Sequence, residues 1–360
     1  MTTKKRVLLV DDSVMVRTAL AQAIRQDGDL EVAGTAANGR IALAKFSALK
    51  PDIVLLDFEM PEMDGLETVR QLRKINPSVP IIMFSSLTER GASLTLEALS
   101  LGATDYVTKP STLDVAATLQ TISQELLAKL RAFCHLPETP AASPAVKPQS
   151  QSPQLIPSRP RALSPVQIVA IGVSTGGPDA LARVLPSLPA NFPVPLVIAQ
   201  HMPKIFTSLL AARLSAKSAL PVCECISGEA LTAGRIVIAP GDFHMVVSQE
   251  DGSPVLKTHQ GPKENFCRPS VDVLFQSIAR LYGPRALAVV LTGMGQDGLK
   301  GCETLRGLGA RIYVQDEASS VVWGMPGFVA RAGLADKILP LDQIGAEIIR
   351  ATTKPMAAQA

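Results

Sequence analysis

The chain has 360 residues, of which 47 % are hydrophobic, and this length predicts two domains, each with its own core. The 35 basic and 32 acidic residues leave a net charge of only +3 without a basic block, which argues against a nucleic-acid-binding protein. No apolar run approaches the ~18 residues of a membrane span, so we expect no direct membrane insertion. The segment MTTKKRVLLVDDS lacks the long apolar stretch of a secretory signal, and the five cysteines are scattered. We therefore expect a cytoplasmic protein.

Residues 1–134 alternate between strand and helix patterns. Five short apolar runs predict strands, and they read KKRVLLV, DLEVAGTA, PDIVLL, PIIMFSS and DYVT. Longer segments between them, such as SVMVRTALAQAIRQ, repeat apolar residues at helical spacing, and residues 111–133 predict a last amphipathic helix. This alternation predicts a doubly wound, flavodoxin-like α/β domain with a five-stranded parallel sheet.

Polar residues gather at the carboxyl ends of these strands. Asp11 and Asp12 follow the first strand and Asp57 ends the third, at the sheet edge where doubly wound domains bind ligands. Three carboxylates at one edge repel one another unless they share a divalent cation, and oxygen ligands suit Mg²⁺. Ser85 and Lys109 add a hydroxyl and a cation. A single acid here would be read as a helix cap; the whole group indicates a site that places a phosphoryl group on Asp57.

The motifs LLVDDS, LLDFEMPEMDG and YVTKP make residues 5–130 resemble the receiver domain of two-component response regulators. The resemblance implies phosphorylation by a histidine kinase with Mg²⁺ as cofactor. It also implies the roles of six residues: Asp57 accepts the phosphoryl group, Asp11, Asp12 and Asp57 hold the metal, Lys109 neutralises charge, and Ser85 and Tyr106 report the phosphorylated state.

Residues 135–163 differ in composition from the segments on either side. Eight prolines lie between Pro137 and Pro165, with serine and glutamine between them. Such a sequence buries too little apolar surface to fold and proline keeps it extended, so we interpret it as a linker between domains.

Residues 164–352 predict a second α/β domain. Candidate strands are VQIVAIGVS, PLVIAQH, RIVIAP, ALAVVLTG and ARIYVQD, and candidate helices are DALARVLPSL, FTSLLAARLSAK and DVLFQSIARL. HMVVSQEDGSPVLKTH alternates around a DG pair, which is typical of a hairpin. We therefore expect a mixed, mostly parallel sheet with a β excursion near residues 243–259.

The segment IGVSTGGP follows the first strand of this domain. It lacks the lysine of a P-loop and the spacing of a dinucleotide-binding fingerprint, but Gly172, Ser174 and Gly176 match G-x-S-x-G at a strand-to-helix turn. The motif alone does not decide between two roles for Ser174, a helix cap and a nucleophile.

A nucleophilic serine needs a base, and the chain has four histidines. His201 ends the next strand, which a right-handed crossover places beside the strand of Ser174. Asp297 follows another buried strand at the same edge, where it could orient His201, cap the next helix or bind a cation. Backbone N–H groups of the glycine turns could stabilise an oxyanion.

A metal site built from cysteines is the other reading of this domain. Cys223 and Cys225 form C-x-C and Cys267 follows in NFCRPS, but zinc requires a fourth ligand and more regular spacing. We therefore do not expect a zinc site, and Cys267 is a weaker candidate nucleophile than Ser174.

IGVSTGGP, IAQHMP, IAPGDFHM, RPSVDVLF and LTGMGQDG together make this domain resemble the chemotaxis protein-glutamate methylesterase (CheB) family. The resemblance implies a methylesterase that demethylates glutamate methyl esters on chemoreceptors, releases methanol, and deamidates receptor glutamines without a cofactor for the esterase reaction. It also implies that the unphosphorylated receiver covers the catalytic rim. The implied site residues are the triad Ser174, His201 and Asp297, with Thr175, Gly176 and Met294 in the substrate and oxyanion region.

Two other functional classes remain open on the sequence. Many response regulators end in a DNA-binding domain, but that domain would be smaller, helical and basic. A receiver linked to a binding or scaffold module without catalysis is the other alternative.

Overall fold

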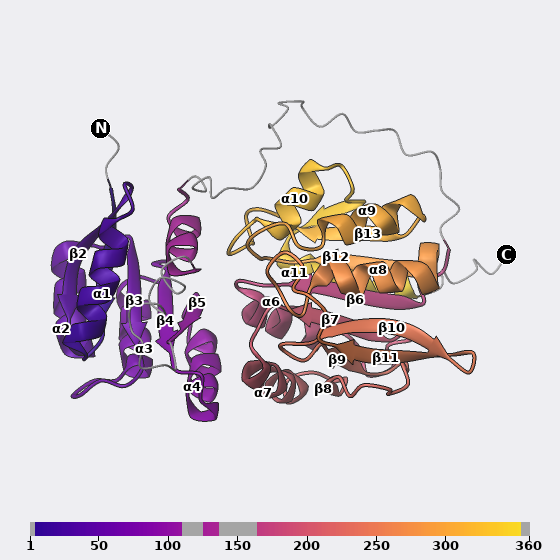
Figure 1. The fold of residues 1–360 in the computed structure, drawn as a ribbon, viewed down its shortest axis with the longest axis horizontal. Helices are drawn as coiled ribbons and strands as arrows, with labels where there is room; N and C mark the ends of the chain where they lie inside the picture. Colours follow the sequence, from indigo (N-terminus) through magenta and orange to yellow (C-terminus); the bar gives the residue numbers. More distant parts are fainter. Residues whose placement is uncertain (1–3, 110–124, 137–163, 354–360) are drawn as a thin grey trace. The chain divides into compact units, whose positions relative to one another are not determined.

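The computed structural model describes residues 4–109, 125–136 and 164–353 (Figure 1). The chain divides into two compact units, Met1–Val146 and Lys147–Ala360, and each is described by itself. The predicted linker at 135–163, apart from its first two residues, and residues 111–124 of the predicted helix lie outside the described residues.

The N-terminal unit contains the predicted five-stranded sheet, in the order β2-β1-β3-β4-β5. All its strand pairs are parallel. The strands are β1 (Lys5–Val10), β2 (Leu30–Ala36), β3 (Ile53–Asp57), β4 (Ile81–Ser85) and β5 (Asp105–Thr108), and the helices are α1 (Val14–Arg25), α2 (Gly39–Leu49), α3 (Gly65–Ile75) and α4 (Glu89–Ser100). Residues 125–133 are helical as well. This is the flavodoxin-like strand order, in which ligands bind where the order reverses beside β1 and β3.

Local sequence explains these elements. The residues of β3 and β4 are all buried, as expected for strands that helices cover on both faces. The helices α1 to α4 each begin at a polar cap: Ser13, Asn38, Asp64 and Thr88 accept a hydrogen bond from a backbone N–H of the first turn. The caps fix where each helix leaves the functional edge of the sheet.

The C-terminal unit is built on a seven-stranded sheet in the order β14-β13-β12-β6-β7-β9-β8. Its strands are β6 (Ile168–Val173), β7 (Leu196–Gln200), β8 (Val222–Glu224), β9 (Ile236–Ile238), β12 (Ala286–Val290), β13 (Arg311–Gln315) and β14 (Lys337–Leu339). Its helices are α6 (Gly177–Val184), α7 (Lys204–Ser215), α8 (Val271–Tyr282), α9 (Leu299–Gly307), α10 (Met325–Arg331) and α11 (Leu341–Thr352), with short 3-10 helices at Leu185–Ser187 and Gly283–Arg285. The central strand β6 lies between β7 and β12, so their three carboxyl ends share one edge.

The predicted mixed sheet is wrong in one respect. The hairpin of β10 (His244–Glu250) and β11 (Ser253–His259) is present, with Asp251 and Gly252 in left-handed conformations at its turn. It does not join the large sheet, however, and all described pairs of that sheet are parallel. The hairpin packs on α8 instead, where Val247 N donates to Ser277 Oγ over 2.9 Å.

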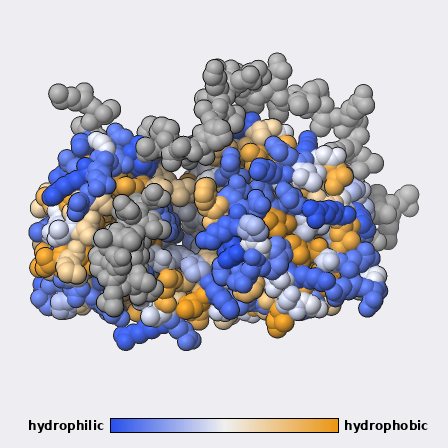
Figure 2. All heavy atoms as spheres, viewed as in Figure 1, coloured by the Kyte–Doolittle hydropathy of each residue, from blue (hydrophilic) through white to orange (hydrophobic). Residues whose placement is uncertain are grey.

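No helix among the described residues is both long and apolar enough to cross a membrane. Figure 2 shows apolar residues in small groups among hydrophilic ones over the face that it presents.

Candidate phosphorylation and active sites

The carboxylates predicted at the edge of the N-terminal sheet lie together. Val10 of β1 pairs with Leu56 of β3, so Asp11 and Asp57 leave adjacent strand ends. Asp11 and Asp57 are buried and Asp12 is exposed. One carboxylate oxygen from each residue lies within 4.8 Å of those from the other two. This set of oxygen donors fits a hard divalent cation such as Mg²⁺.

Lys109 is the cation of this cluster. Its Nζ lies 2.7 Å from Asp57 Oδ2 and 3.2 Å from Asp11 Oδ2. Burial raises the pKa of Asp57 to about 6, although the charge of Lys109 and its hydrogen bond act in the opposite direction. Asp57 is therefore a buried carboxylate that one lysine compensates only in part.

Ser85 and Tyr106 lie on the neighbouring strands β4 and β5. The Ser85 side chain is fully buried, and its Oγ accepts a hydrogen bond of 2.6 Å from Thr95 Oγ1 on α4. Tyr106 is 8 % exposed, and Lys129 Nζ donates to its backbone oxygen over 2.6 Å. The sequence did not indicate Thr95 or Lys129, because both lie within helical patterns.

In the C-terminal unit, IGVSTGGP forms the turn from β6 to α6. Ser174 N donates to Thr292 O over 3.0 Å, and Gly177 N donates to Ser174 O over 2.8 Å. Gly176 has φ 76°, a left-handed conformation that glycine adopts without strain. Ser174 Oγ makes no hydrogen bond to any described residue, so Ser174 is not the cap of α6 here.

Gly172 serves close packing. A Cβ on this residue would lie 2.3 Å from Val271 Cγ1, at the first turn of α8. A side chain at position 172 would therefore push the N-terminus of α8 away from β6. The glycines of the G-x-S-x-G pattern thus have two different physical roles, a left-handed turn at Gly176 and close approach at Gly172.

His201 and Asp297 form a close pair at the same edge. His201 follows β7, which pairs with β6 in the predicted neighbouring position. His201 Nε2 lies 2.7 Å from Asp297 Oδ2, and the two side chains are only 12 % and 2 % exposed. Of the roles that the sequence left open for Asp297, the contact supports orientation of His201.

Asp297 also binds the N-terminus of α8. Its carboxylate accepts hydrogen bonds from Val271 N (2.6 Å), Asp272 N (3.1 Å), Ser270 Oγ (2.8 Å), Asn265 Nδ2 (2.9 Å) and Gly298 N (3.1 Å). Burial alone would raise the pKa of Asp297, but these donors and His201 outweigh it and hold the pKa well below its usual range. Asp297 is thus an ionised carboxylate that holds the N-terminus of α8 and contacts His201.

Cys267 occupies the other side of the His201 ring, which the sequence did not indicate. Its Sγ lies 3.4 Å from His201 Nδ1. The ligand atoms of His201, Cys267 and Asp297 lie close enough to hold a metal ion. Cys267 and Asp297 contact opposite nitrogens of the His201 ring, however, so one ion could not replace both contacts. Burial disfavours a charged His201, but the interactions of its ring with Cys267 and Asp297 outweigh it and raise the pKa of the imidazole.

Gln200 is a further residue that the sequence did not indicate. It is 1 % exposed, and its Nε2 donates to Ser174 O over 3.0 Å and to His201 O over 3.1 Å. Since both partners are carbonyl oxygens, the donor must be the amide nitrogen. Gln200 therefore ties the turn of Ser174 to the backbone of His201. Its polarity within the run PLVIAQH was the available signal.

Of the three residues predicted for the substrate and oxyanion region, Thr175 and Gly176 belong to the turn from β6 to α6 and Met294 follows β12. Thr175 is buried and its carbonyl accepts from Thr292 Oγ1 over 3.0 Å, whereas Met294 is half-buried after β12. Among the described residues, the backbone N–H groups of Thr175 and Gly176 make no hydrogen bond, which leaves two donors available at the start of α6.

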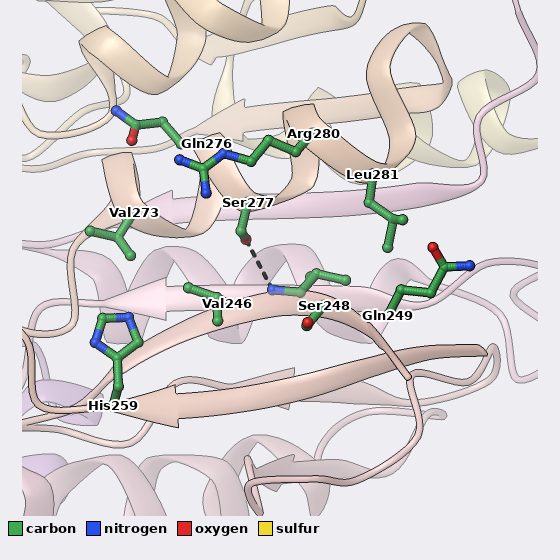
Figure 3. Close-up of a pocket in the computed structure, with 10 residues that line it drawn as sticks. Val246, Ser248, Gln249, His259, Val273, Gln276, Ser277, Arg280 and Leu281 are labelled. Atoms are coloured by element: carbon green, nitrogen blue, oxygen red, sulfur yellow. Dashed lines mark hydrogen bonds between the residues drawn. The ribbon is translucent and has the colours of Figure 1, made fainter. Parts of the chain in front are cut away.

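A groove of about 490 Å³ lies elsewhere in this unit, between β10 and α8 (Figure 3). Residues such as Val246, His259, Gln276 and Arg280 line it, and Ser174, His201 and Asp297 do not. The catalytic candidates therefore lie at the strand ends rather than in this groove.

Both halves of the chain match known protein families. Residues 169–348 match the family described as CheB methylesterase, and residues 7–119 match the response regulator receiver domain. A protein-glutamate methylesterase/protein-glutamine glutaminase of Trichodesmium erythraeum is 48% identical over 96% of this chain and 99% of its own length. One of the same name from Nocardioides sp. is 45% identical over 96% of this chain and 94% of its own. The crystal structure of the Thermotoga maritima CheB methylesterase catalytic domain is 41% identical, with a TM-score of 0.51, over 52% of this chain and 99% of that one.

The contact between Cys267 and His201 gives a testable pKa difference. We expect the pKa of His201 to lie above the ordinary 6.5, so that the imidazole stays protonated to higher pH than in the unfolded chain. Cys267→Ala removes the sulfur that contacts His201 Nδ1 and should lower the pKa. NMR titration of the imidazole signals of wild type and variant measures both values; an unchanged pKa in the variant would contradict the assignment to Cys267.

Proposed function

We infer the activity of this chain from its membership of the CheB methylesterase family: it is a protein-glutamate methylesterase and protein-glutamine glutaminase with a response regulator receiver domain. The alternative of a scaffold module without catalysis has no support among the relatives, which are named as enzymes. We propose domain limits of 1–134 for the receiver, 135–163 for the linker and 164–352 for the catalytic domain, because both family matches fall inside them.

The observation that carries the proposed catalytic roles is the pairing of His201 with Asp297 at the strand end next to Ser174. In the mechanism that we propose, the neutral form of His201 is the base: Ser174 Oγ attacks the ester carbonyl carbon and His201 takes its proton at Nδ1. Nε2–H of His201 continues to donate to ionised Asp297, which holds the tautomer and stabilises the imidazolium. This step requires Ser174 Oγ to reach Nδ1, on the side of the ring that Cys267 contacts.

The tetrahedral intermediate then collapses. His201 returns its proton to the leaving methoxide, methanol departs, and an acyl-enzyme ester on Ser174 remains. Water attacks this ester with His201 again as base, which regenerates Ser174 and releases glutamate. With a glutamine substrate the same steps release ammonia. We propose that the free N–H groups of Thr175 and Gly176 bind the oxyanion, and that Met294 borders the substrate.

The receiver supplies regulation in this proposal. Asp57 accepts a phosphoryl group from a histidine kinase, with Lys109 neutralising the negative charge. Asp11, Asp12 and Asp57 would hold Mg²⁺, which when bound neutralises charge on the phosphoryl oxygens. Ser85 and Tyr106 would respond to the phosphate, because they lie on β4 and β5, the two strands that follow β3 in the sheet, and the buried Ser85 hydroxyl is at the adjacent strand end.

The substrate class follows from the relatives' names, which specify glutamate and glutamine residues of proteins. We propose that these residues belong to the cytoplasmic helices of methyl-accepting chemoreceptors, and that the enzyme therefore acts in the cytoplasm. The pairing with a receiver domain supports this, since it couples demethylation to a signalling kinase. Phosphorylation would favour an arrangement that exposes the catalytic edge.

Replacing the proposed nucleophile tests the mechanism. Ser174→Ala should lower methanol release from methylated receptor membranes by about four orders of magnitude or more, because it removes the oxygen that attacks the ester. Labelled-methanol release measures the rate. Ser208→Ala, an exposed serine on α7, is the matched control and should retain wild-type activity. Activity of Ser174→Ala within tenfold of wild type would refute the assignment.

Regulation is tested at the phospho-acceptor. A small phosphodonor with Mg²⁺ should raise the activity of the full chain, and Asp57→Asn should abolish the increase. A tenfold increase corresponds to about 1.4 kcal/mol of differential stability between the two arrangements. Asp52→Asn is the control, since Asp52 precedes β3 at the opposite end of the sheet. An equal response in the Asp57 variant would contradict the role of Asp57.

A further inference from the structure

A tight turn at residues 264–267 holds two non-glycine residues in left-handed conformations. Glu264 and Cys267 exchange both backbone hydrogen bonds, of 3.2 and 2.8 Å, and between them Asn265 has φ 50° and Phe266 has φ 63°. Two successive left-handed residues define a type I′ turn, which favours Asn followed by Gly. Asn265 satisfies the first position, but a bulky Phe at the second is disfavoured by its Cβ.

The Phe266 side chain is also the most exposed large hydrophobic side chain among the described residues, at 93 %. An exposed aromatic ring gains nothing from packing in the folded chain, so burial does not explain its place in a strained turn. Strain of this kind persists where the neighbouring residues fix the backbone, and it indicates a functional role.

Both neighbours of Phe266 are bound to the catalytic pair. Asn265 Nδ2 donates to Asp297 Oδ1 over 2.9 Å and to Asp272 Oδ2 over 2.9 Å. On the other side, Cys267 Sγ contacts His201 Nδ1. The turn therefore has little freedom to relax, and its exposed ring stands one residue away from contacts with His201 and Asp297.

A second apolar side chain borders the nucleophile turn. Val321 is 36 % exposed, and its Cβ would lie 2.7 Å from a Cβ on Gly176. The two loops that flank the catalytic residues thus each present an apolar side chain to solvent. The reacting glutamate ester is small and uncharged, so residues beside it in the protein substrate must supply much of the affinity.

We propose that Phe266 is a substrate-docking residue, whose ring packs against apolar side chains next to the methylated glutamate on the protein substrate. This rests on the proposed function. Packing of one aromatic ring against an apolar surface acts on substrate binding rather than on the reacting atoms. Phe266 therefore distinguishes a protein substrate from a small ester that carries the same reacting group.

The experiment compares two substrates of the phosphodonor-activated full chain. The protein substrate is methylated receptor in membranes, and the small one is N-acetylglutamate γ-methyl ester. Phe266→Gly should lower kcat/KM for the protein about tenfold, through KM, and leave kcat/KM for the small ester unchanged. It should not lower the Tm, because glycine accepts φ 63° without strain. Phe266→Leu should retain more of the protein activity than Phe266→Gly.

Ile338→Ala is the matched control, because Ile338 is 52 % exposed on β14, the edge strand that lies beyond β12 and β13 from β6. It should leave both substrates unaffected. An unchanged kcat/KM for the protein in Phe266→Gly, or an equal loss on both substrates, would overturn the proposal, the second outcome indicating that the turn only positions His201 and Asp297. If Phe266→Gly raised kcat/KM for the protein substrate in the unphosphorylated enzyme alone, the proposal would be overturned, and a contact of Phe266 with the receiver would explain the result. Failure of the wild type to release methanol from the protein would instead overturn the proposed function.

Discussion

The buried carboxylate of Asp297 is the interaction on which the catalytic unit depends. An ionised carboxylate that is 2 % exposed is stable only if donors surround it, and here the start of α8, Ser270, Asn265 and His201 provide them. Removing one partner of such a buried network typically costs about 3–5 kcal/mol. The same contacts join β12, β7 and α8 at one point, so the catalytic geometry and the packing of the unit have a common cause.

The close approach of α8 to the sheet follows from this carboxylate. Val271 must lie near β6 for its N–H to reach Asp297, and Gly172 leaves the room that this requires. Gly172 belongs to the G-x-S-x-G motif of the nucleophile, but its physical role is to let α8 approach Asp297. Gln200 adds a second link, because its side chain donates hydrogen bonds to the carbonyl oxygens of Ser174 and His201. Residues outside the G-x-S-x-G motif therefore position all three candidate catalytic residues.

The two units contain the same kind of group with opposite electrostatics. Asp57 and Asp297 are both buried aspartates at the carboxyl ends of parallel strands. Asp57 has Lys109 and the Phe58 N–H as partners and its pKa is raised to about 6, whereas the donors around Asp297 hold its pKa far below the usual range. Incomplete compensation suits a carboxylate that must react with a phosphoryl group. Complete compensation suits one that must remain charged and fixed while His201 gains and loses a proton.

Much of the fold was predictable because buried parallel strands are apolar runs that end at polar residues. That pattern located β1, β3, β6 and β7, and their ends located Asp57, Ser174 and His201. Strands β8 and β14 were missed because each has three residues of which only one is buried, whereas the equally short β9 is buried throughout and reads as an apolar run. The hairpin had a clear local signal, but local sequence does not specify whether a hairpin joins a sheet or packs on a helix. The pairing of Cys267 with His201 was also beyond prediction, since 66 residues separate them and cysteine alone does not indicate a partner.

The position of Phe266 shows where chemistry and recognition separate in this fold. The strand ends bring Ser174, His201 and Asp297 to one edge through sheet pairing and buried hydrogen bonds, which leaves little room for variation. The turn at 264–267 is different, because Asn265 and Cys267 fix its backbone while the side chain at position 266 contacts almost nothing of its own chain. A side chain there can change without disturbing the carboxylate network. The fold therefore allows the side chain at position 266 to change substrate specificity, whereas the contacts of Asn265 and Cys267 on either side of it must be kept for catalysis.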